Sequence, residues 1–244
     1  MDWTNSRFET RAIHAGQDPD EQTGAVIVPI YQTSTFAQPS PGQHLGHVYS
    51  RSSNPTRDAL QDALAACEGA KYGLAFASGC AATNAVIATL NAGDEVVAMD
   101  DMYGGTFRLF DKVWRRHGLI FHYADLRDVD AFDAVVTAKT KLLWLETPTN
   151  PMMKLVDIAA LAEKAHARGV TVVVDNTFAT PYLQRPLALG ADIVVHSTTK
   201  YIGGHSDSVG GAMLTSDEAL WQAVKFNQNA AGGTPGPFDS WLTL

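Results

Sequence analysis

The sequence has few cysteines and no long hydrophobic run. Only two of its 244 residues are cysteines, Cys67 and Cys80, and their spacing suits neither a metal site nor a disulfide framework. No apolar stretch reaches the length of a transmembrane helix, and the N-terminus, "MDWTNSRFETRAIHAG", lacks the apolar core of a signal peptide. We therefore expect a soluble protein of the reducing cytoplasm that has no membrane partner.

Basic residues are also scarce. Eighteen lysines and arginines face 26 aspartates and glutamates, which gives a net charge of −8, and the longest basic run is Arg115-Arg116. Binding to nucleic acid needs a basic surface, so nucleic acid is excluded as a main partner. The 45% of hydrophobic residues is enough for one large core. These features predict a globular enzyme or a binding protein.

The first fifty or so residues differ from the rest. The stretch "GAVIVPIYQTSTFAQPSPGQHLGHVYSRSSNPT" is rich in Pro, Gly, Ser and Thr and has no sustained period, yet it is too apolar to be simply disordered. We interpret residues 1–57 as an ordered arm that lies on another surface, such as that of a second subunit, and residues 58–244 as the main domain. A helix is predicted to start at Pro55, because Asn54 is a good N-cap and Leu60 and Leu64 follow at helical spacing.

Seven short apolar runs then alternate with helical stretches. The runs are "YGLAFAS", "EVVAMD", "LIFHYAD", "KLLWLET", "VTVVVDN", "DIVVHS" and "GGAMLTS", and "VDIAALAEKAHARG" is typical of the intervening helices. Several runs are apolar throughout, as expected of parallel strands that are covered on both faces. The pattern predicts an α/β fold with a mainly parallel seven-stranded sheet and helices on both faces. Ligands of such sheets bind outside the carboxyl ends of the strands.

Five of the predicted strands end in polar residues that could serve chemistry. Taken singly, each has an ordinary explanation as a turn, a helix cap or a packing aromatic, but five on one rim indicate a site. The residues that follow the strands are Ser78, Gly79 and Cys80; Tyr103; Asn150; Asp175; and Ser197, Thr199 and Lys200.

Together these residues describe one ligand, pyridoxal phosphate. Free N–H groups at Ser78, Gly79 and Cys80, together with the hydroxyls of Ser197 and Thr199, suit a phosphate. Tyr103 suits a planar ring, Asp175 a protonated ring nitrogen, and Lys200 a carbonyl that forms a Schiff base. The carboxylate keeps the ring nitrogen protonated, and the lysine amine, once released, is a base for substrate protons.

Other chemistries fit less well. Ser197 to Lys200 also reads as the S-x-x-K of serine acyl-enzymes, but their S-D-N and K-T-G motifs are missing. No nucleotide-binding glycine motif follows a strand. His205 and Asp207 have no third ligand at metal spacing, so no metal site is expected.

The sequence resembles the Cys/Met-metabolism pyridoxal-phosphate enzymes, a family of fold type I with an aspartate-aminotransferase-like architecture. The resemblance covers nearly the whole chain and rests on "YSRSSNPTRDAL", "FASGCAATNAV", "DDMYGGTFRLF", "WLETPTNPMMKLVDI", "VVVDNTFATPYLQRPL" and "HSTTKYIGGHSD". The family includes cystathionine γ-synthase, cystathionine γ-lyase, cystathionine β-lyase, methionine γ-lyase and the O-acylhomoserine sulfhydrylases.

The resemblance implies a role for each site residue. Lys200 would be the Schiff-base lysine, Asp175 the partner of the ring nitrogen, and Tyr103 a stacking residue that also helps in proton transfer. Asn150 would lie near the phenolic oxygen of the cofactor. Tyr49 and Arg51 match a pair that reaches the phosphate in the neighbouring subunit, within homodimers that assemble into homotetramers with shared active sites. Phosphate contacts would come from Ser78, Gly79, Cys80, Ser197 and Thr199.

The family pattern also bears on the reaction. Family members continue beyond "GPFDSWLTL" into a smaller domain that carries an arginine for the substrate carboxylate, so we expect this chain to be the arm and the cofactor domain alone. Gly105 stands where methionine γ-lyases have a cysteine, and "GGHSDSVGG" is typical of γ-synthases and γ-lyases. We expect a cystathionine γ-synthase. A γ-lyase is the alternative, then a sulfhydrylase, a methionine γ-lyase or an inactive cofactor-binding fragment.

Overall fold

The centre of the fold is a seven-stranded sheet. The computed structural model describes residue 3 and residues 5–244. Every apolar run predicted to be a strand is one. The strands are β1 (Tyr72–Phe76), β2 (Glu95–Met99), β3 (Ile120–Ala124), β4 (Thr140–Glu146), β5 (Thr171–Asp175), β6 (Ile193–His196) and β7 (Gly211–Thr215).

The sheet is mainly parallel, as predicted. Its order is β1-β7-β6-β5-β4-β2-β3, and β7 alone runs antiparallel to both of its neighbours. Glu146 of β4 pairs with Asp175 of β5, which pairs in turn with Val195 of β6. The carboxyl ends of these three strands are therefore level, and the residues at their ends share one rim of the sheet.

Helices cover both faces of the sheet. They form where the sequence predicts them. Asn54 caps α2 by accepting a hydrogen bond from the Thr56 N–H, and the apolar face of α6 is buried. The helices are α1 (Phe8–His14), α2 (Pro55–Glu68), α3 (Gly79–Ile87), α4 (Gly104–Arg108), α5 (Ala131–Val135), α6 (Ile158–His166), α7 (Thr180–Leu183), α8 (Glu218–Ala231) and α9 (Pro237–Thr243), with short turns η1 (Leu109–Val113), η2 (Trp114–His117) and η3 (Pro186–Leu189).

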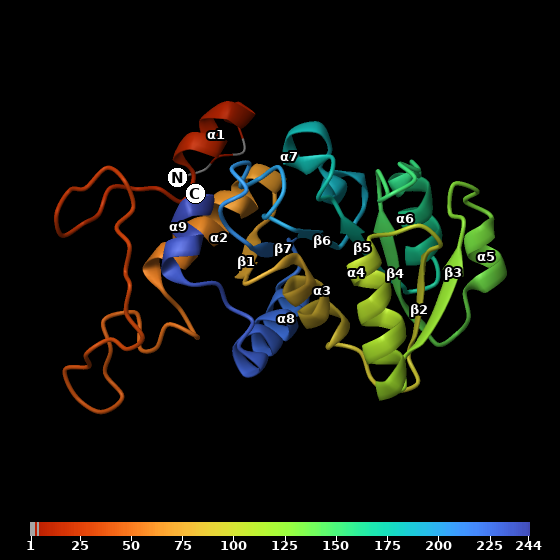
Figure 1. Cartoon of the computed structure of the whole chain (residues 1–244), viewed down its shortest axis with the longest axis horizontal. Coiled ribbons are helices and arrows are strands. Elements are labelled where there is room, and N and C mark those ends of the chain that lie inside the picture. The colour runs from red at the N-terminus through yellow and green to blue at the C-terminus, as the bar shows by residue number, and fades with distance from the viewer. Residues whose placement is uncertain (1–2, 4) are drawn as a thin grey trace.

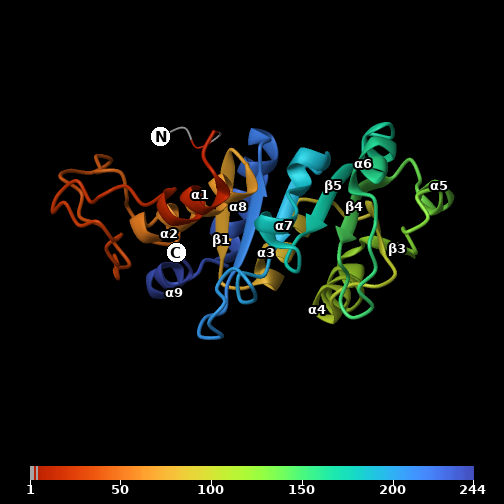
Figure 2. The same cartoon turned by 90° about the horizontal axis from the view of Figure 1, so that it is seen from above.

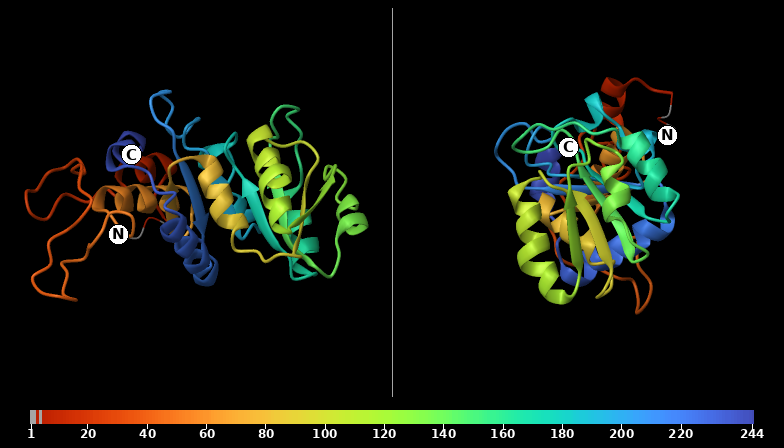
Figure 3. Two further views of the ribbon diagram at one scale, coloured as in Figure 1. Left: turned by 60° about the horizontal axis from the view of Figure 1, so that its bottom comes forward. Right: turned by 90° about the vertical axis from the view of Figure 1, so that its right-hand side faces the viewer.

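The core is divided by the sheet into two layers. On one face α3, α8 and η1 pack around Trp144 and Phe110, whose rings meet edge to face with centroids 5.3 Å apart. On the other face, α6 and α5 pack over β4 and β5, and α2 packs over β6 and β7. Both layers are visible in Figure 3, where the helices lie on either side of the strands. This double cover explains why the central strands are apolar throughout.

The N-terminal region is only partly as expected. A helix, α1, forms at Phe8–His14 and is held by Arg11, which donates a hydrogen bond to the carbonyl of Ala66 in α2. The segment between α1 and α2 has no helix or strand beyond isolated bridges such as that of Thr35 with Tyr49. It extends away from the sheet in two perpendicular views (Figures 1 and 2). Its contact with a second subunit stays a prediction.

The termini of the described chain lie on the same side of the molecule, beside α1 and α9 (Figure 1). Within the described residues, none of the helices has both the length and the apolar character needed to cross a bilayer.

Candidate active site

A cavity of about 300 Å³ opens at the carboxyl ends of the strands, where the sequence places the site. Nine of the eleven predicted site residues line it, and they come from segments that follow five different strands. These nine are Ser78, Gly79, Cys80, Tyr103, Asn150, Asp175, Ser197, Thr199 and Lys200.

Asp175 lies at the end of β5, inside this cavity. Its Oδ1 accepts hydrogen bonds from the N–H of Thr177, at 3.1 Å, and from the Thr177 hydroxyl, at 2.6 Å. The same hydroxyl oxygen accepts the N–H of Ser197 at 2.9 Å, so one threonine links the ends of β5 and β6. Burial raises the pKa of the Asp175 carboxyl, although the bonds from Thr177 oppose this. A cation that entered the cavity would meet a carboxyl with few competing partners.

Glu146 also lines the cavity, and the sequence analysis assigned it no role. It is buried at the end of β4, where its Oε2 accepts the N–H of Tyr103 and its Oε1 accepts the N–H of Asn150, each at 2.8 Å. Burial and the nearby Asp175 raise the pKa of Glu146 to about 8. One carboxyl thus fixes the backbone at two predicted site residues. The available signal was a carboxylate at the last position of an otherwise apolar strand.

The part of the cavity at the start of α3 is suited to an anion. Ser78 caps α3, and its side chain accepts the N–H of Ala81 at 3.1 Å. The N–H groups of Gly79 and Cys80 lie in the first helical turn, where the helix offers no carbonyl, and no other acceptor for them occurs among the described residues. Such groups and the positive end of the helix favour a phosphate.

Gly79 is required by the close approach of two segments. A Cβ at this position would lie 2.8 Å from the Cβ of Ser197 and 3.0 Å from its Cα. Only glycine lets the start of α3 lie against the turn that follows β6. This contact brings Ser78, Gly79 and Ser197 to the same end of the cavity.

Thr199 lines the cavity, but its hydroxyl is already engaged. It donates to the carbonyl of Gly210 at 3.1 Å and accepts the N–H of Gly210 at 3.0 Å. The sequence analysis expected this hydroxyl to bind a phosphate. In the structure it joins the segment after β6 to the segment that leads into β7, and its contact with a phosphate stays a prediction.

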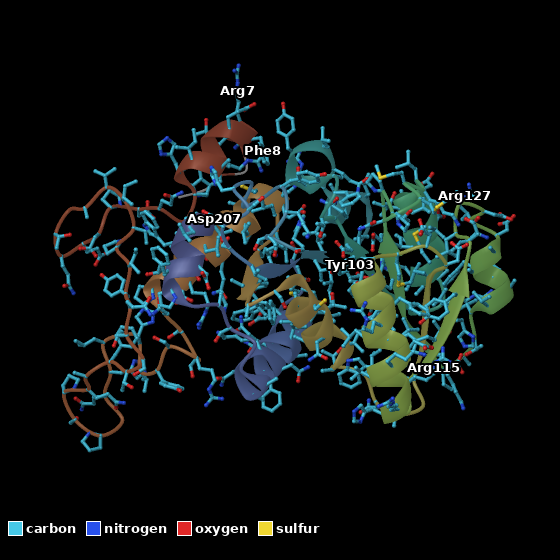
Figure 4. The ribbon with its side chains drawn as sticks, in the orientation of Figure 1. Arg7, Phe8, Tyr103, Arg115, Arg127 and Asp207 are labelled. Atoms are coloured by element: carbon cyan, nitrogen blue, oxygen red, sulfur yellow. The ribbon has the colours of Figure 1, made fainter. Side chains whose placement is uncertain are left out.

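Lys200 and Tyr103 are both exposed residues of the site. Lys200 lies in the turn after β6, and its side chain makes no hydrogen bond or ion pair with any described residue. Tyr103 is 44% exposed and stands just before α4, in the central part of the molecule (Figure 4). Its ring lies so close to Gly105 that a Cβ there would be 2.3 Å from the ring. A cysteine at position 105 would therefore displace this tyrosine.

Tyr49 and Arg51, the remaining two predicted residues, do not line this cavity. The Arg51 guanidinium lies 5.4 Å from the centre of the Tyr49 ring, and its Nη1 donates to the carbonyl of Asn229 at 2.7 Å. Both belong to the segment before α2. Their contact with the phosphate of a neighbouring subunit stays a prediction.

A cavity lined by an amine, a carboxyl and an anion site is the expected set for pyridoxal phosphate, and comparison with known proteins agrees. Residues 9–244 match the family described as "Cys/Met metabolism PLP-dependent enzyme". The chain belongs to this family. The family resemblance seen in the sequence is confirmed, and so is pyridoxal phosphate as the cofactor of the family.

Three relatives carry three different names. The chain is 60% identical over 237 residues to a "Probable cystathionine gamma-synthase" of Herpetosiphon aurantiacus, covering 97% of this chain and 74% of that protein. It is 53% identical to a cystathionine gamma-lyase of Dictyostelium discoideum, covering 98% and 62%. It is 52% identical to a cystathionine beta-lyase of Coxiella burnetii, again covering 98% and 62%.

A solved structure confirms the fold. The crystal structure of metB from Corynebacterium glutamicum superposes with a TM-score of 0.98 at 46% identity, covering all of this chain and 64% of that one. This chain thus spans less than two thirds of most of these proteins.

The cavity residues fit the family's cofactor. The free N–H groups at the start of α3 provide for its phosphate, and the absence of a Cβ at Gly79 leaves that end open. Asp175 provides a carboxyl for the ring nitrogen, and Lys200 provides an amine without a competing partner among the described residues.

Proposed function

We propose that this chain forms the cofactor-binding part of an enzyme that acts at the γ-carbon of homoserine-derived amino acids. The favoured reaction is that of a cystathionine γ-synthase, which joins an O-acylhomoserine to cysteine. The alternative is a γ-lyase, which splits cystathionine into cysteine, 2-oxobutyrate and ammonia. The observation that carries the proposal is a single cavity that holds an unpaired Lys200 amine, the Asp175 carboxyl and the anion site at α3.

Each part of the cavity has a proposed role in holding the cofactor. The N–H groups of Gly79 and Cys80, with Ser78 and Ser197, would bind the phosphate. Asp175 would accept the hydrogen of the ring nitrogen and so maintain its positive charge. When bound, pyridoxal phosphate withdraws electrons from the substrate carbon that carries the amino group, which makes its hydrogen acidic.

Two residues would move protons. Lys200 would hold the cofactor covalently in the resting protein, and its Nζ, once freed by the substrate amine, would remove protons at the α- and β-carbons. The Tyr103 hydroxyl is proposed to help in proton transfer, and its ring to cover the cofactor. Glu146 would keep Tyr103 and Asn150 in place through the two backbone hydrogen bonds.

We further propose a homodimer, itself paired into a homotetramer, in the cytoplasm. Tyr49 and Arg51 would then reach the phosphate bound by the neighbouring subunit. Neither residue lines the cavity of its own chain, which supports this; the Arg51 guanidinium lies against the Tyr49 ring and donates to the Asn229 carbonyl in α8.

The first experiment is a visible absorption spectrum of the protein mixed with pyridoxal phosphate, before and after treatment with borohydride. We expect a visible band that borohydride removes, and a pyridoxyl group on the peptide that contains Lys200. A band with the group on another lysine would refute the assignment of Lys200. No band at any cofactor concentration would refute cofactor binding by this chain.

The second experiment separates the two reactions. The loaded protein is incubated with O-succinylhomoserine or O-acetylhomoserine and cysteine, and separately with cystathionine, and products are identified by mass spectrometry. Cystathionine formed in the first mixture supports the γ-synthase. Release of 2-oxobutyrate in the second mixture alone supports the γ-lyase, and release of pyruvate would instead indicate cleavage at the β-carbon.

A further inference from the structure

A second polar cluster lies directly behind the cavity, on the opposite face of the sheet. Glu68, the last residue of α2, and His196, the last residue of β6, form a hydrogen-bonded pair with 2.6 Å between Oε1 and Nε2. The exposed fractions of their side chains are 0% and 1%. Nothing in the proposed reaction uses this pair.

The cluster is connected to the ends of three strands. Glu68 Oε1 also accepts a hydrogen bond from Asn176 Nδ2, at 3.0 Å, and Asn176 directly follows β5. The Asn176 Oδ1 accepts from Gln184 Nε2 at 2.9 Å, and the same Gln184 nitrogen donates to the carbonyl of Thr147, just after β4, at 3.0 Å. An ionised Glu68 has no hydrogen to give, so we assign the hydrogen of its bond with His196 to the Nε2 atom.

Each of these strand ends contributes one residue to the cavity and its neighbour to the cluster. Glu146 and Asp175 line the cavity, and the residues after them, Thr147 and Asn176, belong to the cluster. At β6 the order is reversed, because His196 belongs to the cluster and Ser197 lines the cavity. Successive side chains of a strand point to opposite faces, so a group fixed on one face fixes its neighbour on the other.

The energetics argue against a purely stabilising role for the pair. Burying a carboxyl and an imidazole removes both groups from water, and well-packed apolar residues often stabilise a fold as well or better. Here one oxygen of Glu68 (Oε2) and one nitrogen of His196 (Nδ1) are buried without a partner among the described residues, which adds to the cost. A cluster that is costly for folding yet touches three cavity-forming strand ends calls for a functional reason.

We propose that Glu68 is a positioning residue for cofactor binding. Through His196 and Asn176 it holds the ends of β6 and β5 at one spacing, so that Ser197 and Asp175 stand ready for the phosphate and the ring nitrogen before the cofactor arrives. This inference rests on the proposed binding of pyridoxal phosphate in the cavity. Supporting groups of this kind decide how well a site is preorganised.

The sheet offers a matched control at its other end. Glu95, at the start of β2, pairs with His122 of β3 at 2.8 Å, and its Oε2 also accepts the hydroxyl of Thr137. The pair joins the same two residue types but is partly exposed, and it does not border the cavity. Changes there report the effect of losing a Glu–His pair that is not connected to the cavity.

The experiment measures the dissociation constant of pyridoxal phosphate, by titration of the visible band, and the thermal midpoint of the cofactor-free protein. Four variants are compared with wild type: Glu68→Gln, Glu68→Leu, the double variant Glu68→Leu/His196→Leu, and the control Glu95→Leu. Glu68→Gln keeps an acceptor oxygen for both donors, so its dissociation constant should stay within threefold of wild type. Glu68→Leu should weaken binding at least tenfold, and Glu95→Leu should leave it within twofold.

The double variant separates a loss of cofactor positioning from a loss of fold stability. It also provides the test if Glu68→Leu alone does not fold. Replacing both partners by apolar residues removes the unpaired histidine, so the thermal midpoint should recover toward that of wild type. Cofactor binding should remain at least tenfold weaker. Wild-type affinity in the double variant would overturn the positioning role, as would wild-type affinity in a folded Glu68→Leu. Failure of the wild type itself to attach the cofactor at Lys200 would overturn the proposed function, and this inference with it.

Discussion

The amino ends of the sheet and the cavity at its carboxyl ends hold their charged residues differently. At the amino ends, the carboxyl groups are hydrogen-bonded to histidine side chains. Glu95 pairs with His122, and Asp192, just before β6, accepts hydrogen bonds from His166 Nε2 and from the N–H of Val172. At the carboxyl ends, the cavity carboxyls of Asp175 and Glu146 are bonded only to N–H and hydroxyl groups.

This difference separates polar groups that only stabilise the fold from polar groups that remain able to bind a ligand. Paired groups at the amino ends satisfy one another and leave little for a ligand. At the carboxyl ends, two carboxyls share a cavity with Lys200, whose amine has no partner among the described residues. Burial raises the pKa values of both carboxyls, and the nearby Asp175 raises that of Glu146 further, a state that a bound cation would relieve. Four substitutions test this contrast.

Lys200→Ala should have the largest effect. Removing the only amine that lines the described cavity should abolish the borohydride-fixed pyridoxyl group entirely, while cofactor held by the other contacts remains removable by dialysis. Lys154→Ala is the control at the same rim, because Lys154 is already paired with Asp100 at 2.8 Å and Asp125 at 3.4 Å. Peptide mass spectrometry after reduction locates the pyridoxyl group in both variants. Full labelling of Lys200→Ala at another lysine would remove Lys200 from its role.

Gly79→Ala should have the second-largest effect, a weaker binding of the cofactor. The new methyl group would approach Ser197 to 2.8 Å, so the start of α3 and the turn after β6 must separate at the anion site. We expect the dissociation constant of pyridoxal phosphate to rise at least tenfold. Gly104→Ala, at the start of α4, is the control, since a Cβ there meets nothing within 4 Å. Equal affinities in the two variants would show that the close approach is unimportant for binding.

Much of this arrangement could be predicted from the sequence, because local patterns determine it. Apolar runs predict the seven strands, and Asn54 before Pro55 predicts the start of α2. Other features depend on contacts between distant residues. Nothing local indicates that β7 inserts antiparallel between β1 and β6, or that the Thr199 hydroxyl binds Gly210. The pairing of Glu68 with His196 joins residues 128 positions apart, beyond any spacing rule.

Glu146→Gln should change how stability depends on pH. A carboxyl whose pKa rises to about 8 on folding binds a proton in the folded protein that the unfolded chain releases near pH 4.5. Folding stability of the cofactor-free protein should therefore fall as pH rises from about 5 to 8, by up to about 1.4 kcal/mol per pH unit. The variant has no such proton, so its urea-unfolding free energy should vary less over this window. Parallel pH profiles for the two proteins would contradict the raised pKa.

Glu95→Gln should have the smallest effect, and with the opposite sign. The bond from the Thr137 hydroxyl, with a smaller contribution from His122, lowers the pKa of Glu95, so its ionised form stabilises the fold above about pH 4.5 and this stabilisation is lost as pH falls further. Because the pair is partly exposed, we expect a loss of no more than about 1 kcal/mol at pH 7. Urea unfolding at pH 7 and pH 3.5 should show the difference between variant and wild type shrinking in acid. Cofactor affinity should not change, since Glu95 and His122 bond to each other and neither lines the cavity. A weaker cofactor complex in this variant would mean that the two ends of the sheet are coupled through the strands, and the contrast between them would then be one of degree.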